Sequence, residues 1–267
     1  MEQRQTVLID TSETREGFVL VTLKRPERRN AFDRLMIDEL REVFVEIGKD
    51  RSVRGVILTG AGPVFCAGAD LHWMGSESVT MAEARTDAES LLMLLRAIDD
   101  CPCPVIGKIQ GPAFGGGIGL IAACDIVVAR ADATFALSEV RVGLVPAVIA
   151  PLLLRKTGPS FLRRYGLTGE PFSASIAKEA GLVHEVVEPS SLDARVDHVA
   201  ELVGRSAPDA VREAKVLFRK LGTLSEDEQG KLAVETNVRA RLSPEAREGL
   251  RAFREKREPV WPGAIIE

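Results

Sequence analysis

The sequence predicts an α/β fold that is followed by a C-terminal helical region. Short apolar runs typical of buried strands alternate with helical patterns as far as residue 187, and only helical patterns follow residue 188. Such alternation predicts a parallel sheet with crossover helices. We therefore divide the chain into an α/β core over residues 1–190 and a helical region over residues 191–267.

The first elements are a strand and an amphipathic helix. Residues 18–23 are apolar and rich in β-branched side chains, which predicts a buried strand. Apolar side chains then recur with helical spacing at Met36, Leu40, Val43, Phe44 and Ile47. One strand and one helix thus open the alternating pattern.

A loop of small residues follows the next predicted strand. Residues 56–59 form an apolar run, and Gly-Ala-Gly-Pro at residues 60–63 predicts a turn. The sequence Phe-Cys-Ala-Gly-Ala-Asp-Leu at residues 65–71 comes next. Its small side chains leave the backbone accessible.

A glycine-rich loop follows a third predicted strand at residues 104–109. It has the sequence Gly-Pro-Ala-Phe-Gly-Gly-Gly-Ile-Gly at residues 111–119, and residues 120–123 predict a short apolar helix. Glycine is unfavourable inside a helix, so three in succession indicate close approach of the backbone to another group. Amide groups at a helix N-terminus favour a phosphate, a carboxylate or a developing oxyanion.

Three structural explanations fit this glycine-rich loop. It is a tight turn packed on another backbone, a dinucleotide-binding loop, or an oxyanion hole. Gly117, Gly119 and Ala122 fit the dinucleotide pattern G-x-G-x-x-A, with Glu139 about twenty residues later. However, the next predicted strand, residues 125–129, begins too soon for the crossover helix of a Rossmann unit. The loop of small residues at 65–71 offers a second accessible stretch of backbone, and this favours the oxyanion hole.

Helical signals dominate the last part of the chain. Leu192, Val196, Val199 and Val203 share one helical face. Ser225 with Glu228 forms a capping-box pattern, and Ser243-Pro244 has the pattern of an N-cap and a first helical residue.

Composition excludes several classes of protein. The formal charge of −4 argues against a nucleic-acid binder, and a chain of 267 residues with 45% hydrophobic content can bury a full core. The four cysteines lack the paired spacing of a zinc site, so we expect buried reduced thiols and no metal. Residues 1–6 are polar, and no apolar run reaches membrane-spanning length. We therefore expect a cytoplasmic protein.

Six sequence motifs together resemble the enoyl-CoA hydratase/isomerase (crotonase) superfamily. They lie in the order of that family and span nearly the whole chain: residues 25–32, 65–71, 111–117 with 123–126, 135–146, 181–187 and 252–257. The resemblance implies a spiral of ββα turns with C-terminal helices. It also implies that the core over residues 1–190 holds an acyl-CoA site, and that residues 191–267 are an oligomerisation region that builds a homotrimer or a dimer of trimers. The implied substrate is an acyl-CoA thioester, with no separate cofactor.

The same resemblance implies a catalytic mechanism. The amides of Ala69 and Gly116 match the two donors that bind the thioester oxygen in the family, and Glu139 matches a catalytic acid/base. Alone, a glutamate beside Val140 and Arg141 is more typical of a surface ion pair. A carboxylate in an apolar pocket instead has a raised pKa that suits a general base.

Further positions match family contacts to coenzyme A. These are Arg29, Ala31, Ala67, Asp70, His72, Phe253 and Lys256. In much of the family a lysine stands where this chain has His72. In the family, the contacts that Phe253 and Lys256 match often come from a neighbouring subunit.

The sequence departs from the best-known hydratases at Gly119, where they carry a second glutamate. Single-glutamate members include double-bond isomerases and hydratases of branched, carboxylated enoyl-CoAs such as 3-methylglutaconyl-CoA in leucine breakdown or carboxygeranoyl-CoA. Residues 135–151 most resemble the second group. We expect a hydratase of this type; the alternatives are an isomerase or decarboxylase that uses the same oxyanion hole, or a non-catalytic acyl-CoA-binding subunit.

The acyl pocket is the least defined part of the predicted site. A carboxylated acyl group needs a cation, for which Arg141, Arg155 and His72 are candidates. For Arg141 and Arg155 we expect instead a solvated charge on a helix or loop. We expect Trp73 and Met74 to pack under the Asp70 loop rather than to line the acyl pocket.

Overall fold

A computed structural model describes residues 4–10, 16–74 and 79–261, and its centre is a six-stranded sheet. The strand order is β1 (Val7–Asp10), β2 (Phe18–Leu23), β3 (Gly55–Gly60), β4 (Val105–Ile109), β6 (Ile126–Arg130) and β9 (Glu185–Val187). Strand β1 is antiparallel to β2, and all other neighbours are parallel. The predicted parallel sheet is confirmed. Of the polar start over residues 1–6, residues 1–3 lie outside the described part.

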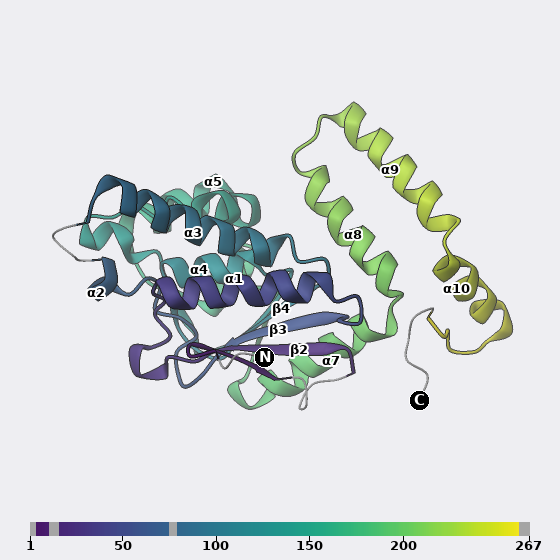
Figure 1. The fold of residues 1–267 in the computed structure, drawn as a ribbon, viewed down its shortest axis with the longest axis horizontal. Helices are drawn as coiled ribbons and strands as arrows, with labels where there is room; N and C mark the ends of the chain where they lie inside the picture. The colour runs from purple at the N-terminus through teal and green to yellow at the C-terminus, as the bar shows by residue number, and fades with distance from the viewer. Residues whose placement is uncertain (1–3, 11–15, 75–78, 262–267) are drawn as a thin grey trace.

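Helices cover both faces of this sheet (Figure 1). Helices α1 (Arg34–Lys49), α3 (Met81–Asp99) and α4 (Gly116–Ala123) lie on one face, and α7 (Leu192–Arg205) lies on the other. Because successive strand residues point to opposite faces, Val56 and Leu58 of β3 join the core under α1, whereas Ile57 packs with α7. The predicted apolar face of α1 is buried.

A smaller three-stranded sheet supports the second half of the site. It consists of β5 (Ala113–Phe114), β7 (Thr134–Ala136) and β8 (Phe172–Ser173). Phe135 and Phe172 of this sheet pack with Phe161 and Tyr165 of α5 (Ala150–Thr168). Helix α5 also contacts the short 3-10 helix η2 (Ser138–Val142), which follows β7.

Helix α4 begins at Gly116, four residues earlier than the sequence predicts. A Cβ atom on Gly117 would lie 2.5 Å from the Cys66 carbonyl oxygen, so these glycines let α4 pack directly on the neighbouring loop. Strands β4 and β6 are parallel neighbours, and the eight-residue α4 connects them. The connection is a single short helix, and the fold is not a Rossmann unit, as the early start of the next strand predicts.

The C-terminal helices follow the predicted capping signals. Helix α9 (Glu226–Arg241) begins at the capping box of Ser225 and Glu228, and Ser243 caps α10 (Pro244–Glu255). Helices α8 (Pro208–Leu221), α9 and α10 extend away from the sheet (Figure 1). Lys215 of α8 ties them to the core through Asp125, at 2.6 Å. The first helix after residue 190, α7, packs on the sheet.

Other expectations concern thiols, metals and membranes. The four cysteines are free and buried, and burial raises the pKa of the Cys66 thiol to about 12. Among the described residues no group of His, Cys, Asp and Glu side chains has the arrangement of a metal site. Nor does any helix in the described ranges combine the length and apolar character needed to cross a bilayer.

Asn30 fixes the loop that precedes α1. Its side chain is fully buried, and its backbone has a left-handed φ of 53°. The side-chain amide donates hydrogen bonds to the carbonyl oxygens of Ala61 and Val64, each at 2.8 Å, and its oxygen accepts from the Arg25 N–H at 3.0 Å. Asn30 thereby joins the turn after β2 to the loop after β3.

We expect Asn30→Ala to lower the free energy of unfolding by about 2 kcal/mol. The Ala61 carbonyl and the Arg25 amide lose this side-chain partner, and the Val64 carbonyl keeps only its bond from Gln110. Asn30→Asp should destabilise the protein at least as much, since its carboxylate would face the same two carbonyl oxygens. Exposed Asn237→Ala on α9 is the control and should change stability by less than about 0.5 kcal/mol. Urea unfolding measures all three. A wild-type midpoint for Asn30→Ala would show that Asn30 does not hold these loops.

Candidate active site

Two loops meet at the carboxyl edge of the large sheet. One follows β3 and contains residues 65–71, and the other follows β4 and contains residues 111–117. Gly68 has a φ of 86°, and a Cβ atom there would lie 2.7 Å from the Phe114 carbonyl oxygen and 3.3 Å from the Gly116 nitrogen. The two backbones are therefore in direct contact, which requires glycine at position 68.

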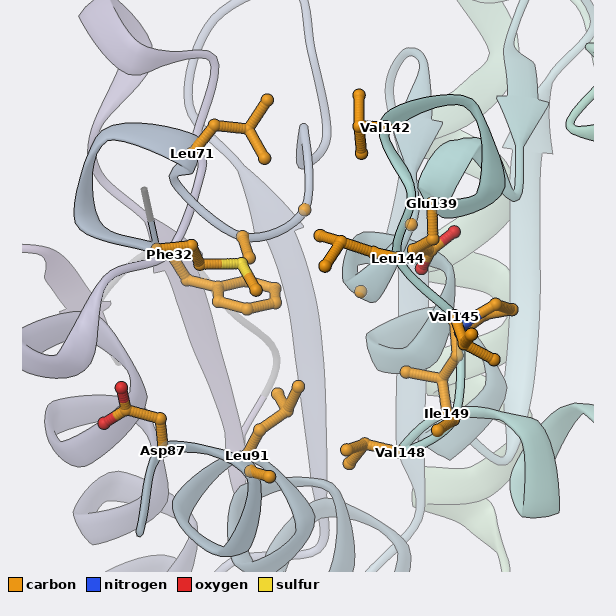
Figure 2. A pocket seen from close by; sticks show the side chains of 18 of the residues that line it. Phe32, Leu71, Asp87, Leu91, Glu139, Val142, Leu144, Val145, Val148 and Ile149 are labelled. Carbon is orange, nitrogen blue, oxygen red and sulfur yellow. The ribbon is translucent and has the colours of Figure 1, made fainter. Parts of the chain in front are cut away.

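A cavity of about 390 Å³ opens beside this contact (Figure 2). Backbone of both loops lines it at Ala69 and Gly116, and Glu139 lines it from η2. Most of the other lining side chains are apolar: Phe32, Ile37, Leu71, Trp73, Met74, Val79, Leu91, Val142, Leu144, Val145, Val148 and Ile149. The cavity joins polar main-chain groups and one carboxylate to an apolar chamber, an arrangement typical of small-molecule sites.

The amides of Ala69 and Gly116 are available to a ligand. The backbone on either side of Ala69 is hydrogen-bonded to Phe32: the Asp70 N–H donates to the Phe32 carbonyl at 2.9 Å, and the Gly68 carbonyl accepts from the Phe32 N–H at 2.9 Å. Gly116 is the first residue of α4, where amides have no partner inside the helix. In the described part of the chain neither the Ala69 nor the Gly116 N–H donates a hydrogen bond. Two free amides on one cavity wall can receive an oxygen that gains negative charge.

Glu139 presents an unpaired carboxylate to the same cavity. Its Oε1 lies against the glycine loop, because a Cβ atom on Gly115 would be 3.0 Å from it. Its Oε2 is buried and has no hydrogen-bond partner among the described residues. Burial raises the pKa of Glu139 above the ordinary value of 4.5. A carboxylate in this state suits proton transfer near neutral pH.

The position of the second family glutamate, Gly119, has no room for a side chain. Gly119 is buried in α4, and a Cβ atom there would lie 2.4 Å from Cγ2 of Ile149. Ile149 lines the cavity at this point. The described lining has two carboxylates, Glu139 and Asp87, and Figure 2 shows them on opposite sides of the cavity.

Four of the predicted coenzyme A contacts lie together beside the cavity. They are Arg29, Ala31, Ala67 and Asp70. The Ala67 N–H donates to the Arg29 carbonyl at 3.0 Å, and the Asp70 N–H donates to the Phe32 carbonyl at 2.9 Å, so the two segments run side by side. Arg25 donates to the Ala31 carbonyl at 2.6 Å and pairs with Asp70 at 3.3 Å. Although burial acts to raise it, the pKa of Asp70 is lowered overall by the His72 N–H and by Arg25.

The remaining predicted contacts are spread more widely. His72 is exposed on the short helix α2 (Leu71–Met74), close to Asp70. Phe253 and Lys256 are at the end of α10, which lies far from α2 and α3 in Figure 1. One chain therefore does not bring these two residues to its own cavity. Their contact with coenzyme A stays a prediction, as do the roles assigned to the other site residues.

Two expectations about the acyl pocket change with the structure. Trp73 and Met74 both line the cavity, so the expectation that they only pack under the Asp70 loop is wrong. Of the candidate cations, Arg141 lines the cavity, whereas Arg155 pairs with Asp99 at 2.5 Å outside it. Sequence reasoning missed Ile149 and Asp87. Helical spacing of Asp87 with Leu91 was the signal available for Asp87.

Comparisons with known proteins agree with this fold and site. The sequence profile of the family described as "Enoyl-CoA hydratase/isomerase" matches residues 13–264. The enoyl-CoA hydratase AKT6-1 of Alternaria alternata is 35% identical over 93% of this chain and 82% of its own length. The mevalonyl-coenzyme A hydratase sidH of Aspergillus fumigatus is 34% identical over 91% of this chain and 90% of its own.

Solved structures confirm the predicted fold class. A crystal structure of enoyl-CoA hydratase from Mycobacterium smegmatis superposes with a TM-score of 0.92. It is 34% identical in sequence, and the alignment covers 96% of this chain and 99% of the other. The spiral α/β fold expected from the motifs is thus confirmed.

We expect Gly116→Val to abolish binding of a CoA thioester at this site. The new Cβ would meet the Phe32 ring at 2.3 Å, and that ring lines the cavity, so either the ring or the valine must enter the space beside the amides. Titration calorimetry with pentanoyl-CoA measures the loss. Gly230→Ala on α9 is the control because its Cβ meets nothing within 4 Å. Wild-type affinity in a folded Gly116→Val protein would exclude this site.

Proposed function

The chain belongs to the enoyl-CoA hydratase/isomerase family, and we propose that it adds water across the 2,3 double bond of an enoyl-CoA thioester. One observation carries the proposal: the unpaired Glu139 carboxylate faces the same cavity as the free amides of Ala69 and Gly116. These three groups are what hydration of a conjugated thioester requires.

The proposed reaction begins at the thioester oxygen. The amides of Ala69 and Gly116 bind this oxygen and draw electrons from the double bond, which makes C3 electrophilic. Ionised Glu139 takes a proton from water while the water oxygen bonds to C3. The resulting enolate is held by the same amides, and protonated Glu139 then gives its proton to C2. The sum is addition of one water, with Glu139 ionised again.

Glu139 performs both proton transfers in this scheme, because Ile149 fills the space beside Gly119. A single carboxylate also suits a double-bond isomerase, which moves one proton between C2 and C4, and the same oxyanion hole suits decarboxylation. Gly119 is the feature that favours these alternatives. Hydration is preferred because two relatives aligned over more than 90% of the chain bear the name hydratase. A non-catalytic acyl-CoA-binding subunit would bind thioesters without product.

We propose that the acyl group is branched. Ile149, Val148 and Leu144 form one apolar wall, and Leu91 and Ile37 lie among the other lining residues. One relative is named for the mevalonyl group, which is branched. A carboxylated group such as 3-methylglutaconyl, which would place the enzyme in leucine breakdown, depends on Arg141 as its cation. The rates of hydration of 3-methylcrotonyl-CoA and 3-methylglutaconyl-CoA distinguish an apolar branched acyl group from a carboxylated one.

We also propose that the protein acts in the cytoplasm as a homotrimer or a dimer of trimers. Helices α8 and α10 expose large apolar side chains, among them Phe218 at 69% and Phe253 at 82%. A neighbouring copy that covers them would also bring Phe253 and Lys256 toward coenzyme A. We expect light scattering to give a mass of three or six chains; a monomer at micromolar concentration would contradict this.

We expect Glu139→Gln to lower hydration by a factor of about 10² to 10⁴, the usual contribution of a general acid/base. Crotonyl-CoA, 3-methylcrotonyl-CoA and a 3-enoyl-CoA are incubated with each protein, and the products are resolved by mass. Binding of pentanoyl-CoA should persist in Glu139→Gln, since the amides are unchanged. The control is Glu170→Gln, which removes an exposed ion pair with Arg164. An isomer or carbon dioxide without hydration would instead support the alternatives.

The pH dependence provides a second readout of the same prediction. Water is activated by ionised Glu139, and burial raises the pKa of this group above 4.5. The kcat/KM value should therefore fall as the pH decreases through that raised pKa, with its midpoint above 4.5. A flat acidic profile over this range would contradict the role of Glu139 as base.

A further inference from the structure

Two cysteines lie together on the loop that joins α3 to β4, outside the acyl-CoA cavity. The Sγ atoms of Cys101 and Cys103 are 3.6 Å apart, and Pro102 separates the two residues in the chain. Both side chains are buried, and neither lines the acyl-CoA cavity. The two thiols are hydrogen-bonded to each other. A disulfide has an S–S length of about 2.05 Å, so the sulfurs need to approach by about 1.5 Å to form one.

The other two cysteines are in a different state. The Cys66 Sγ donates to the Asn30 carbonyl at 3.1 Å, and the Cys124 Sγ donates to the Leu120 carbonyl at 3.3 Å. Burial raises the pKa of both thiols to about 12. Each is therefore held as a neutral thiol by a backbone carbonyl. These two thiols are internal controls for the pair.

A positive charge from α8 lies beside the pair. Lys215 donates to the Cys103 carbonyl at 3.1 Å and pairs with Asp125 at 2.6 Å, and its side chain is only 9% exposed. The hydrogen bond from Cys103 and the Lys215 charge lower the pKa of the Cys101 thiol below its ordinary value of 9.0. Burial and the charge of Asp125 act against this shift. The pair therefore yields a thiolate, the form that reacts with oxidants, more readily than an isolated buried thiol does.

A small cavity of about 80 Å³ leads to the pair. Its lining includes Cys103 and Pro102, the exposed residues Asp50 and Arg51, and Arg212 of α8. Because exposed residues form part of its wall, the cavity reaches the surface of the chain. A cavity needs only about 10–15 Å³ to hold one water, so this one admits a molecule as small as hydrogen peroxide.

We propose that Cys101 and Cys103 form a reversible oxidation site, at which a small hydroperoxide converts the two thiols into an intrachain disulfide. The site goes beyond the proposed function, because none of its residues belongs to the acyl-CoA cavity. A disulfide between residues two positions apart closes a short ring, and strained disulfides are easier to reduce than structural ones. A thiol reductant therefore restores the pair.

The oxidation balances in two steps. The hydrogen bond between the sulfurs lets the charge pass to Cys103, which lines the cavity. This sulfur attacks one oxygen of the hydroperoxide: an S–O bond forms, the O–O bond breaks, and the other oxygen takes up a proton and leaves as an alcohol, or as water from hydrogen peroxide. The Cys101 thiol then attacks the Cys103 sulfur, the S–S bond forms, and the S–O bond breaks with release of water. In sum, two thiols lose two electrons and one hydroperoxide is reduced.

Hydrogen peroxide tests the proposal on the folded full chain. After limited oxidation, the remaining thiols are alkylated in denaturant and the protein is cleaved with trypsin. One tryptic peptide, residues 97–108, holds both thiols of the pair, and Cys66 and Cys124 fall on two others. We expect peptide 97–108 to lose two hydrogen atoms and to escape alkylation, at least about tenfold faster than Cys66 or Cys124 is oxidised. Dithiothreitol should restore both thiols.

Substitutions assign the oxidation to the pair. In Cys101→Ser the sulfenic acid at Cys103 has no thiol to attack it, so dimedone should trap it on peptide 97–108. Cys124→Ser is the matched control and should still form the disulfide. Thermal unfolding shows that each protein is folded before oxidation.

Three results would overturn the proposal. The first is a peptide 97–108 with both thiols alkylated after peroxide treatment that oxidises free glutathione. The second is a disulfide that joins two chains in place of the intrachain one. The third is oxidation of Cys66 and Cys124 at the same rate as the pair, since this would show that peroxide reacts with the unfolded chain.

Discussion

The contact between two backbones, at Gly68 and Gly116, is the constraint on which the site depends. A Cβ atom on Gly68 would lie 3.3 Å from the Gly116 nitrogen, so the loops after β3 and β4 approach as closely as main chains can. This approach places two unpaired amides on one cavity wall. Because the amides belong to the backbone, their direction is fixed before a ligand arrives, and fixed donors stabilise developing charge without reorganisation.

The structure around this contact serves to hold it. Asn30 ties the turn after β2 to the loop after β3. Helix α4 packs on the same loop through Gly117, because any larger side chain there would collide with Cys66. Helix α5, which contributes Phe161 and Tyr165 to the aromatic cluster, contacts η2, the element that carries Glu139. Gly119 and Ile149 complete the arrangement. They leave no space for a second carboxylate, so in the proposed reaction both proton transfers are assigned to Glu139.

Sequence reasoning predicted the parts of this protein that local chemistry determines. Strand β2, the buried face of α1 and the capping box at Ser225 follow from residue spacing alone, and the glycine-rich loop indicated a close approach of backbones. The start of α4 was misplaced because tertiary packing overrides the low helix propensity of glycine. Ile149 and Asp87 are separated in sequence from the rest of the site, and only the folded chain shows that they border one cavity. Trp73 lies close to Asp70 in sequence, but only the folded chain shows that it borders the cavity.

The most direct test of the central claim is the carbonyl stretching frequency of a bound thioester. Pentanoyl-CoA labelled with ¹³C at its carbonyl is measured by isotope-edited infrared difference spectroscopy, free in water and bound to the protein. Two main-chain donors at Ala69 and Gly116 should polarise the carbonyl and shift its stretch to a lower frequency than in water. A bound thioester whose carbonyl absorbs at or above the frequency in water would contradict the oxyanion hole, and with it the proposed chemistry.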